Sequence, residues 1–102
     1  MHKVIHTYTH PGGQIGVMVE VACETDFAGR TEVFGTFVHD VALQVAAMAP
    51  ANVEDLLKQD FVKDATRSID IGDLLKKVQE ELKEDCAILR FVRWYTIEET
   101  KV

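Results

Sequence analysis

Four histidines, at positions 2, 6, 10 and 39, are the side chains of this chain best suited to bind a metal ion. His6 and His10 fall on one face of an extended segment, but four residues of strand separate them by about 13 Å. That separation is too long for two ligands of one ion. The chain also contains no C-x-x-C pair. The pattern therefore predicts histidines on the surface and in turns, and no metal site.

The candidate nucleophiles are equally isolated. Cys23, Cys86 and Ser68 have no general base at a spacing typical of a catalytic motif. The glycine pair at 12–13 fits a turn better than a phosphate-binding loop. The acidic run at 80–85 is typical of the solvated end of a helix. We therefore expect a protein that is not an enzyme and that needs no cofactor.

The segment VEVACETDFAGR at 19–30 places Thr25, Asp26 and Phe27 where an apolar strand meets a helix. In one interpretation Thr25 or Asp26 caps the helix and Phe27 packs into the core, because capping side chains and buried phenylalanines are both common. In the other, the ring projects from a rigid corner as a hot spot for a partner. Composition and spacing alone favour the first interpretation.

The elements that position this corner begin with a hairpin. Residues 3–9 and 14–24 are rich in β-formers, and the sequence HPGG at 10–13 between them indicates a turn. A third β-rich segment covers 86–97. With helices between the second and third strands, the sequence predicts an α+β fold in which a three-stranded antiparallel sheet packs against helices. The length fits one domain over 1–102.

Two amphipathic helices are predicted between the strands. Apolar side chains recur at steps of three and four over 34–48 and 71–82, and Ser68 or Asp70 can cap the second helix. The less regular segment 51–69 suggests a short helix or turn pinned to the core. On the first helix, we expect much of the remaining surface to be formed by Glu32, Thr36, Asp40 and Gln44.

The last strand carries large side chains on both faces. Leu89, Phe91, Arg93 and Tyr95 alternate with Ile88, Arg90, Val92 and Trp94. In an antiparallel sheet with one solvent-exposed face, each strand should instead alternate apolar and polar residues. A second apolar patch is therefore predicted, formed by Met18, Ala22, Ile88, Val92 and Trp94. Since a small domain usually covers such a patch with a partner, we infer self-association through the sheet.

Charge and hydropathy disfavour several other partners. The net charge is −6 and the basic residues are scattered, which is unfavourable for binding a phosphate backbone. No apolar run approaches the ~20 residues that span a bilayer, and the N-terminus lacks a secretory signal. Two cysteines are too few for a disulfide scaffold. We expect a cytoplasmic protein that binds neither nucleic acid nor a membrane.

Nearly the whole chain resembles elongation factor Ts, the guanine-nucleotide exchange factor of bacterial and organellar translation. Cys23–Phe27 matches the C-[EQ]-T-D-F signature of that family, and His6–Gly13 resembles its hairpin. The sequence LLKQDFVKD at 56–64 resembles its LLEQPF[IV]KD segment, with Asp60 where proline is usual. Leu89–Trp94 resembles its last strand.

The chain also departs from the family pattern. Residues 1–102 contain no counterpart of the family's N-terminal three-helix module, and the segment between Pro50 and Leu56 is much shorter than usual. Gly29 lies in Ala28–Arg30, where V-A-[RK] is typical. The chain therefore resembles a minimal, single-copy core of the factor, and this resemblance implies a homodimer.

The resemblance implies a function in binding rather than chemistry. It implies that the chain binds elongation factor Tu, GDP-bound and nucleotide-free, and promotes GDP release. In the family the Asp-Phe pair pushes into the GTP-binding domain of the partner and disturbs the contacts of Mg²⁺ and phosphate. Carried over to this chain, Phe27 is the wedge, Asp26 is its polar companion and cap, and Thr25 shapes the corner. With Arg30, these residues form the predicted partner site.

A second contact region is less sharply defined. The candidates for the dimer interface, or for contact with another domain of the partner, are Met18, Val92, Arg93 and Trp94. Two alternatives stay open beside the exchange factor. One is a protein of the same fold that binds elongation factor Tu without exchange, and the other is a small metal- or thiol-dependent enzyme.

Overall fold

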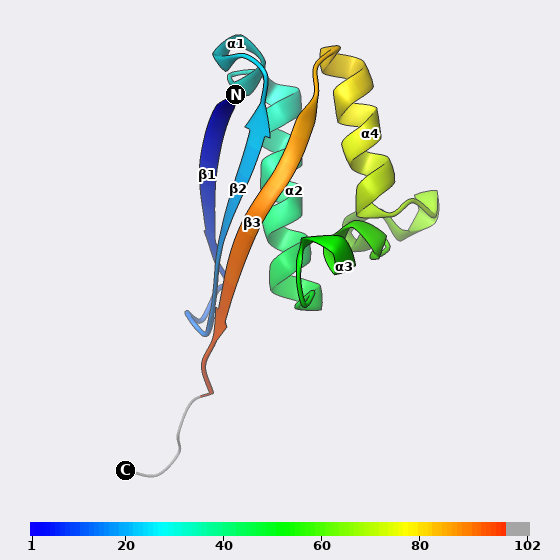
Figure 1. Ribbon diagram of the computed structural model, residues 1–102. Coiled ribbons are helices and arrows are strands. Elements are labelled where there is room, and N and C mark those ends of the chain that lie inside the picture. Colours follow the sequence, from blue (N-terminus) through cyan, green and yellow to red (C-terminus); the bar gives the residue numbers. More distant parts are fainter. Residues whose placement is uncertain (98–102) are drawn as a thin grey trace.

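The computed structural model describes residues 1–97 (Figure 1). Its elements follow one another in the order β1 (His2–Thr9), β2 (Ile15–Cys23), α1 (Asp26–Gly29), α2 (Glu32–Met48), α3 (Val53–Lys58), the 3₁₀ segment η1 (Val62–Arg67), α4 (Ile71–Leu82) and β3 (Cys86–Tyr95). The predicted strands, the two long helices and the α+β class are confirmed. The irregular segment 51–69 contains α3 and η1.

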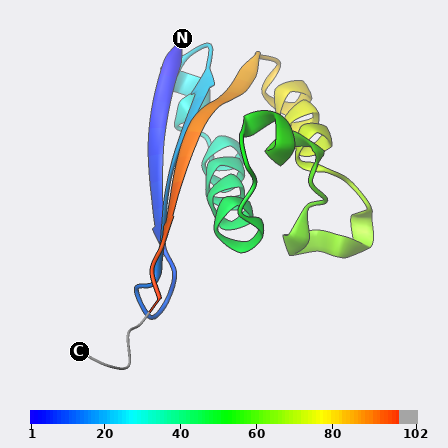
Figure 2. The ribbon, with the colours of Figure 1, turned by 60° about the horizontal axis from the view of Figure 1, so that its bottom comes forward.

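The three strands form one antiparallel sheet in the order β1-β2-β3. Gly12 and Gly13 make the β1–β2 turn with φ of +101° and +72°, values at which a side chain would be strained. The helices lie on one face of the sheet and leave the other face uncovered (Figures 1 and 2). Within 1–97, no helix combines the length and apolar character needed to cross a bilayer.

The core lies between β2 and α2. Val19 and Val21 on β2, and Phe34, Phe37 and Val41 on α2, each expose at most 2% of their surface. The strand period of two and the helix period of three to four bring these side chains onto facing surfaces. This packing fixes the strand that ends at the Thr25 corner.

Part of the polar side of α2 is covered rather than solvated. Gln44 is fully buried, its Nε2 donates to the Asp60 carbonyl at 2.9 Å, and its Oε1 accepts from the Val62 amide at 3.1 Å. Asp40 is also buried, and Lys63 Nζ donates to its carboxylate at 2.9 Å. The expectation of a surface position is therefore wrong for Asp40 and Gln44, whereas Glu32 and Thr36 are exposed as expected. The segment from α3 to η1 lies over the covered part, and each buried polar group has a partner there.

A β-bulge changes the faces of β3. Glu20 pairs with Arg90, but Val21 pairs with Ile88, so Leu89 is an extra residue in the strand. Ile88 consequently points into the core with 7% exposure, and Leu89 is 40% exposed. The expectation that Ile88 shares a face with Val92 and Trp94 is wrong, because the bulge reverses the alternation between them.

Candidate partner-binding corner

The corner between β2 and α1 is built by a capping threonine. Thr25 has extended backbone angles, and its Oγ1 accepts a hydrogen bond from the Ala28 amide at 3.2 Å. Asp26 is the first residue of α1 and not its cap, which corrects that part of the expectation. The Asp26 carboxylate instead pairs with Arg30 Nη2 at 3.0 Å. Because both side chains are largely exposed, this ion pair adds little stability.

Phe27 points away from the protein. Its side chain is 80% exposed, whereas the next residue, Ala28, is 3% exposed and anchors α1 to the core. The structure therefore contradicts the interpretation in which Phe27 is a core residue. An exposed ring on an ordered single turn of helix is what the second interpretation requires.

The C-terminal end of α1 is also held by hydrogen bonds. Thr31 Oγ1 donates to the Ala28 carbonyl at 2.7 Å and accepts from the Phe34 amide at 3.2 Å, so it ends α1 and caps α2. Gly29 lies against the ring of His2, and a Cβ at this position would meet that ring at 2.5 Å. The glycine that departs from the family pattern thus permits close packing of α1 on the first strand.

Glu84, from the turn after α4, holds the residues that precede α1 in the corner. Its Oε1 accepts from the backbone amides of Glu24 and Thr25 at 3.0 and 3.1 Å, and its Oε2 accepts from Thr25 Oγ1 at 2.6 Å. In return, the Asp85 amide donates to Glu24 Oε2 at 2.6 Å. The hydrogen bonds from Thr25, above all from its hydroxyl, lower the pKa of Glu84. Glu84 is therefore not simply part of a solvated helix end.

No local signal in the sequence could have identified Glu84. It lies 59 positions from Thr25, and nothing distinguishes it from the neighbouring acidic residues Glu80 and Glu81. Only the pairing of β2 with β3, which sets Cys23 opposite Cys86, brings the two loops together.

The two cysteines are poor nucleophiles. Cys23 and Cys86 are both buried, and burial is the main cause that raises the pKa of each thiol, for Cys86 to about 11. The negative charge of Glu84 acts in the same direction on both. Because the thiolate is the reactive form, these thiols are disfavoured for catalysis at neutral pH.

The histidines do not form a metal centre in the part of the chain that the structure describes. His6 Nε2 and His39 Nδ1 lie 3.0 Å apart, and His10 Nδ1 lies 3.0 Å from the Tyr8 hydroxyl. Within residues 1–97, no group of three or more histidine, cysteine or carboxylate side chains could hold an ion. The contact of His6 with His39 joins β1 to α2, and that of His10 with Tyr8 lies within the hairpin.

The second predicted contact region is divided between the two faces of the sheet. Met18 and Val92 pair across β2 and β3 on the uncovered face, and both are 45% exposed. Trp94 lies two residues further on the same face and is 78% exposed. Arg93 lies on the helix side, where its guanidinium donates to the Ala46 carbonyl. Three of the four candidates therefore share a surface, and Arg93 does not.

Comparison with known proteins places this corner in a family. A family model described as "Elongation factor TS" matches residues 1–56, which include the whole corner. Elongation factor Ts of Coprothermobacter proteolyticus is 34% identical, over 89% of this chain and 68% of that protein. The chain belongs to the elongation factor Ts family. It is thereby assigned to the translation elongation factors.

Other relatives show how much of an elongation factor Ts is present. The Nostoc sp. protein is 35% identical over 99 residues, which are 97% of this chain but only 30% of that relative. The protein of Syntrophobacter fumaroxidans is 52% identical over 62 residues, or 59% of this chain and 30% of that protein. The chain thus spans under a third of the length of these two members of the elongation factor Ts family.

The Coprothermobacter alignment also shows a difference in length between the two proteins within the matched region. It runs over 136 positions, which is more than the 102 residues of the whole chain. That elongation factor Ts therefore carries additional residues inside the matched region. The comparison therefore agrees with the expectation that this chain lacks residues that other members of the family carry within the matched region.

Proposed function

We propose that this chain binds elongation factor Tu and promotes the release of GDP by presenting Phe27 to the GTP-binding domain. The observation that carries the proposal is the 80% exposure of Phe27 on a corner whose backbone is capped and anchored. A large exposed aromatic side chain on an ordered turn has the character of an interface hot spot. Membership of the elongation factor Ts family supports this choice of partner.

The proposed mechanism is differential binding. Burying a phenylalanine ring in a partner contributes about 1.5–3 kcal/mol. The corner is already ordered, so little of this binding free energy is lost in ordering it. The remainder can offset the free-energy cost of distorting the partner. If the docked ring lowers the affinity of the partner for Mg²⁺ and GDP, thermodynamic reciprocity requires that bound GDP lowers the affinity of the partner for this chain by the same factor. The chain then binds the nucleotide-free partner most tightly, and no chemical step is needed.

The polar residues beside Phe27 have supporting roles in this proposal. Thr25 caps α1 and sets the direction in which the ring leaves the corner. Asp26 and Arg30, close to Phe27 in the sequence of this corner, form an exposed ion pair that is available for contacts with the partner. These residues lie at one end of the molecule, where α1 follows β2 (Figure 1).

Phe27→Ala tests the proposal directly. The variant is expected to fold normally, because an exposed side chain contributes within about 0.5 kcal/mol to stability. Stimulated release of labelled GDP from elongation factor Tu should fall by about 30-fold or more, which corresponds to the loss of about 2 kcal/mol at a hot spot. Ile97→Ala is the matched control, since Ile97 is 73% exposed and follows the far end of β3.

Co-elution with elongation factor Tu separates exchange from simple binding. A wild-type chain that co-elutes but leaves GDP release unchanged would support the alternative, a binding protein of the same fold without exchange activity. A folded Phe27→Ala variant with full exchange activity would show that the wedge lies elsewhere.

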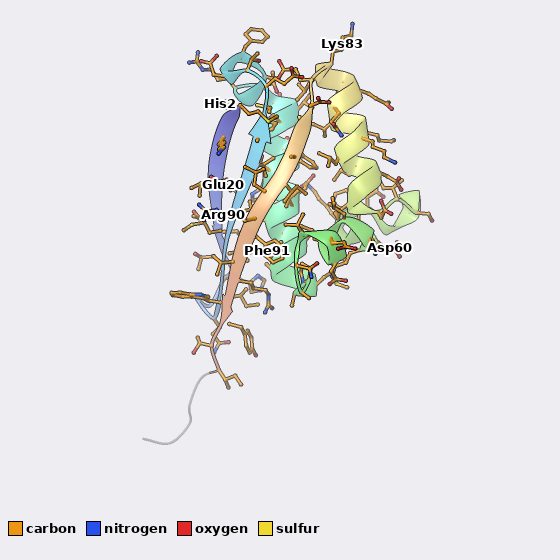
Figure 3. The ribbon with its side chains drawn as sticks, in the orientation of Figure 1. His2, Glu20, Asp60, Lys83, Arg90 and Phe91 are labelled. Atoms are coloured by element: carbon orange, nitrogen blue, oxygen red, sulfur yellow. The ribbon has the colours of Figure 1, made fainter. Side chains whose placement is uncertain are left out.

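We further propose that two copies of the chain associate through the uncovered face of the sheet. Met18, Val92 and Trp94 expose a contiguous apolar surface there, and Ile5 on β1 is 54% exposed on the same face. Glu20 and Arg90 form an ion pair of 2.9 Å beside it (Figure 3). Since a small domain rarely leaves such a face to solvent, a second copy with the same surface is the proposed cover.

The proposed setting of this activity is the cytoplasm, where elongation takes place. The net charge of −6 argues against nucleic acid as a direct ligand of the chain. The partner surface is therefore expected to be protein in both contact regions.

A further inference from the structure

The carboxylate of Glu84 is placed to control the corner that carries Phe27. It accepts three hydrogen bonds, all from residues 24 and 25, at distances between 2.6 and 3.1 Å. One donor is the hydroxyl of Thr25, which simultaneously accepts from the Ala28 amide. A single anion thus orients the capping hydroxyl and satisfies the two backbone amides that lead into α1.

Two consecutive hydrogen bonds connect Glu84 to the turn that carries Phe27. Donation to Glu84 fixes the rotamer of Thr25, and the fixed hydroxyl oxygen holds the Ala28 amide. Phe27 lies between these two residues. The backbone that carries the ring is therefore held in one conformation, although the ring makes no core packing of its own at 80% exposure.

Backbone geometry presents Glu84 to the corner. Lys83 ends α4 in the left-handed conformation with φ of +57°, and the Glu84 amide donates back to the Gln79 carbonyl. This turn directs the chain from α4 towards β3 at the end of the molecule where α1 lies (Figures 1 and 3). The reciprocal bond from the Asp85 amide to Glu24 holds the two loops together.

We propose that Glu84 is a positioning residue for nucleotide exchange, which keeps the Thr25–Phe27 corner in the conformation that docks on the GTPase. This inference rests on the proposed function. Without Glu84, the corner samples other conformations, and only a fraction of the molecules is competent to dock. The apparent affinity falls by that fraction, whereas the maximal rate from the docked complex is unchanged.

Glu84→Ala tests the inference, with Glu80→Ala as the matched control. Glu80 is also an exposed carboxylate near the end of α4, and its removal changes the net charge equally. The concentration of Glu84→Ala that gives half-maximal GDP release from elongation factor Tu is expected to rise about tenfold, with the maximal rate close to that of wild type. Glu84→Gln, which keeps an acceptor for the amides, should lie between Glu84→Ala and wild type. Glu80→Ala should match wild type.

A double variant separates positioning from a general loss of stability. If Glu84 acts only by placing the ring, Glu84→Ala causes no further loss of exchange in a Phe27→Ala background. A purely structural role would reduce exchange in both backgrounds alike. An additive loss, or a Glu84→Ala variant with unchanged half-maximal concentration, would overturn the inference.

NMR relaxation of the chain alone keeps this test independent of the exchange assay. In Glu84→Ala the amide order parameters of residues 25–28 should fall from the rigid range near 0.85 towards about 0.6, and in Glu80→Ala they should not. Unchanged order parameters together with unchanged amide chemical shifts of residues 25–28 would overturn the inference even if exchange were lost. If the wild-type chain does not stimulate GDP release, the proposed function fails, and the relaxation result alone decides whether Glu84 positions the corner.

Discussion

His6 and His39 form a contact whose strength depends on pH. The ring of His6 on β1 meets the ring of His39 on α2 edge to face, with their nitrogens 3.0 Å apart. This hydrogen bond needs at least one neutral ring, because a nitrogen must accept. Burial, and secondarily the charge of His39, lower the pKa of His6 below its usual 6.5. Folding therefore favours the neutral form of His6.

Stability is expected to decrease when the pH falls below 6.5. Because the pKa of His6 is lower in the folded chain, the unfolded chain binds more protons in this range, and the free energy of unfolding rises with pH. The contribution of neutral His6 to the free energy of unfolding is complete above pH 6.5. It is lost as the pH falls through the lowered pKa of His6 in the folded chain. Urea unfolding between pH 7.5 and 5.5 measures this slope.

His6→Gln should flatten this pH dependence, because the group that responds is removed. His10→Gln is the control, since His10 contacts Tyr8 and lies in the exposed turn. A His6→Gln variant that keeps the wild-type slope would show that another group is responsible.

At the scale of elements, Arg93 joins the end of α2 to the sheet. Its Nε and Nη2 both donate to the Ala46 carbonyl, at 3.2 and 3.0 Å, in the last turn of the helix. Carbonyls in the last turn of a helix lack intrahelical partners, and a cation there also complements the helix dipole. The guanidinium lies 5.6 Å from the centre of the Tyr95 ring, which supports the same orientation. Arg93 is thus a structural residue of β3.

Arg93→Ala should lower the free energy of unfolding by about 1.5–3 kcal/mol, the range for hydrogen bonds that involve a charged group. Arg93→Lys should recover part of this loss, because an ammonium group can donate to the same carbonyl but lacks the planar fork. Arg90→Ala serves as the control in urea unfolding, since Arg90 pairs on the exposed face and is 74% exposed. A loss below 0.5 kcal/mol in Arg93→Ala would contradict the capping role.

On the scale of the whole molecule, the two proposed interfaces do not overlap. Trp94 pairs with Gly16, seven residues before Cys23, and Ile5 pairs with Glu20, three residues before it, so about 10–23 Å of strand separates the dimer patch from the corner. The corner lies at one end of the sheet, where α1 follows β2 (Figure 1), and the residues of the patch lie on the uncovered face. We therefore expect a dimer through this face to leave both copies of Phe27 accessible to partners.

Trp94→Glu should convert the proposed dimer into a monomer. A charge in a buried interface, together with the loss of an aromatic anchor, is expected to raise the dissociation constant at least about 100-fold. Sedimentation equilibrium measures this change. Tyr95→Glu is the control, because Tyr95 is 58% exposed but points to the other side of the same strand.

A wild-type chain that is monomeric at high micromolar concentration would refute the proposed sheet interface. Unchanged association of Trp94→Glu would refute the part assigned to Trp94. Neither result would affect the proposal for Phe27, since the two surfaces are separate.

The sequence alone determined the elements and the family. Apolar periodicity reflects which face of a strand or helix is buried, so the hairpin, the two long helices and the last strand could be predicted from it. Cys23–Phe27 indicated the corner, and the ordered matches along the chain indicated elongation factor Ts. Each of these signals lies within one segment of the chain.

Only the tertiary structure decided the remaining points, because each depends on contacts between distant segments. Local propensity left Phe27 with two interpretations, and the packing of Ala28 and Thr31 resolved them in favour of exposure. One extra residue in β3 turned Ile88 inward, which a strict period of two could not predict. Glu84 acquired its role because strand pairing brings its carboxylate to amides 59 and 60 positions away. A sequence pattern reports the burial of an element's own face, but it does not report which other segment will meet that face.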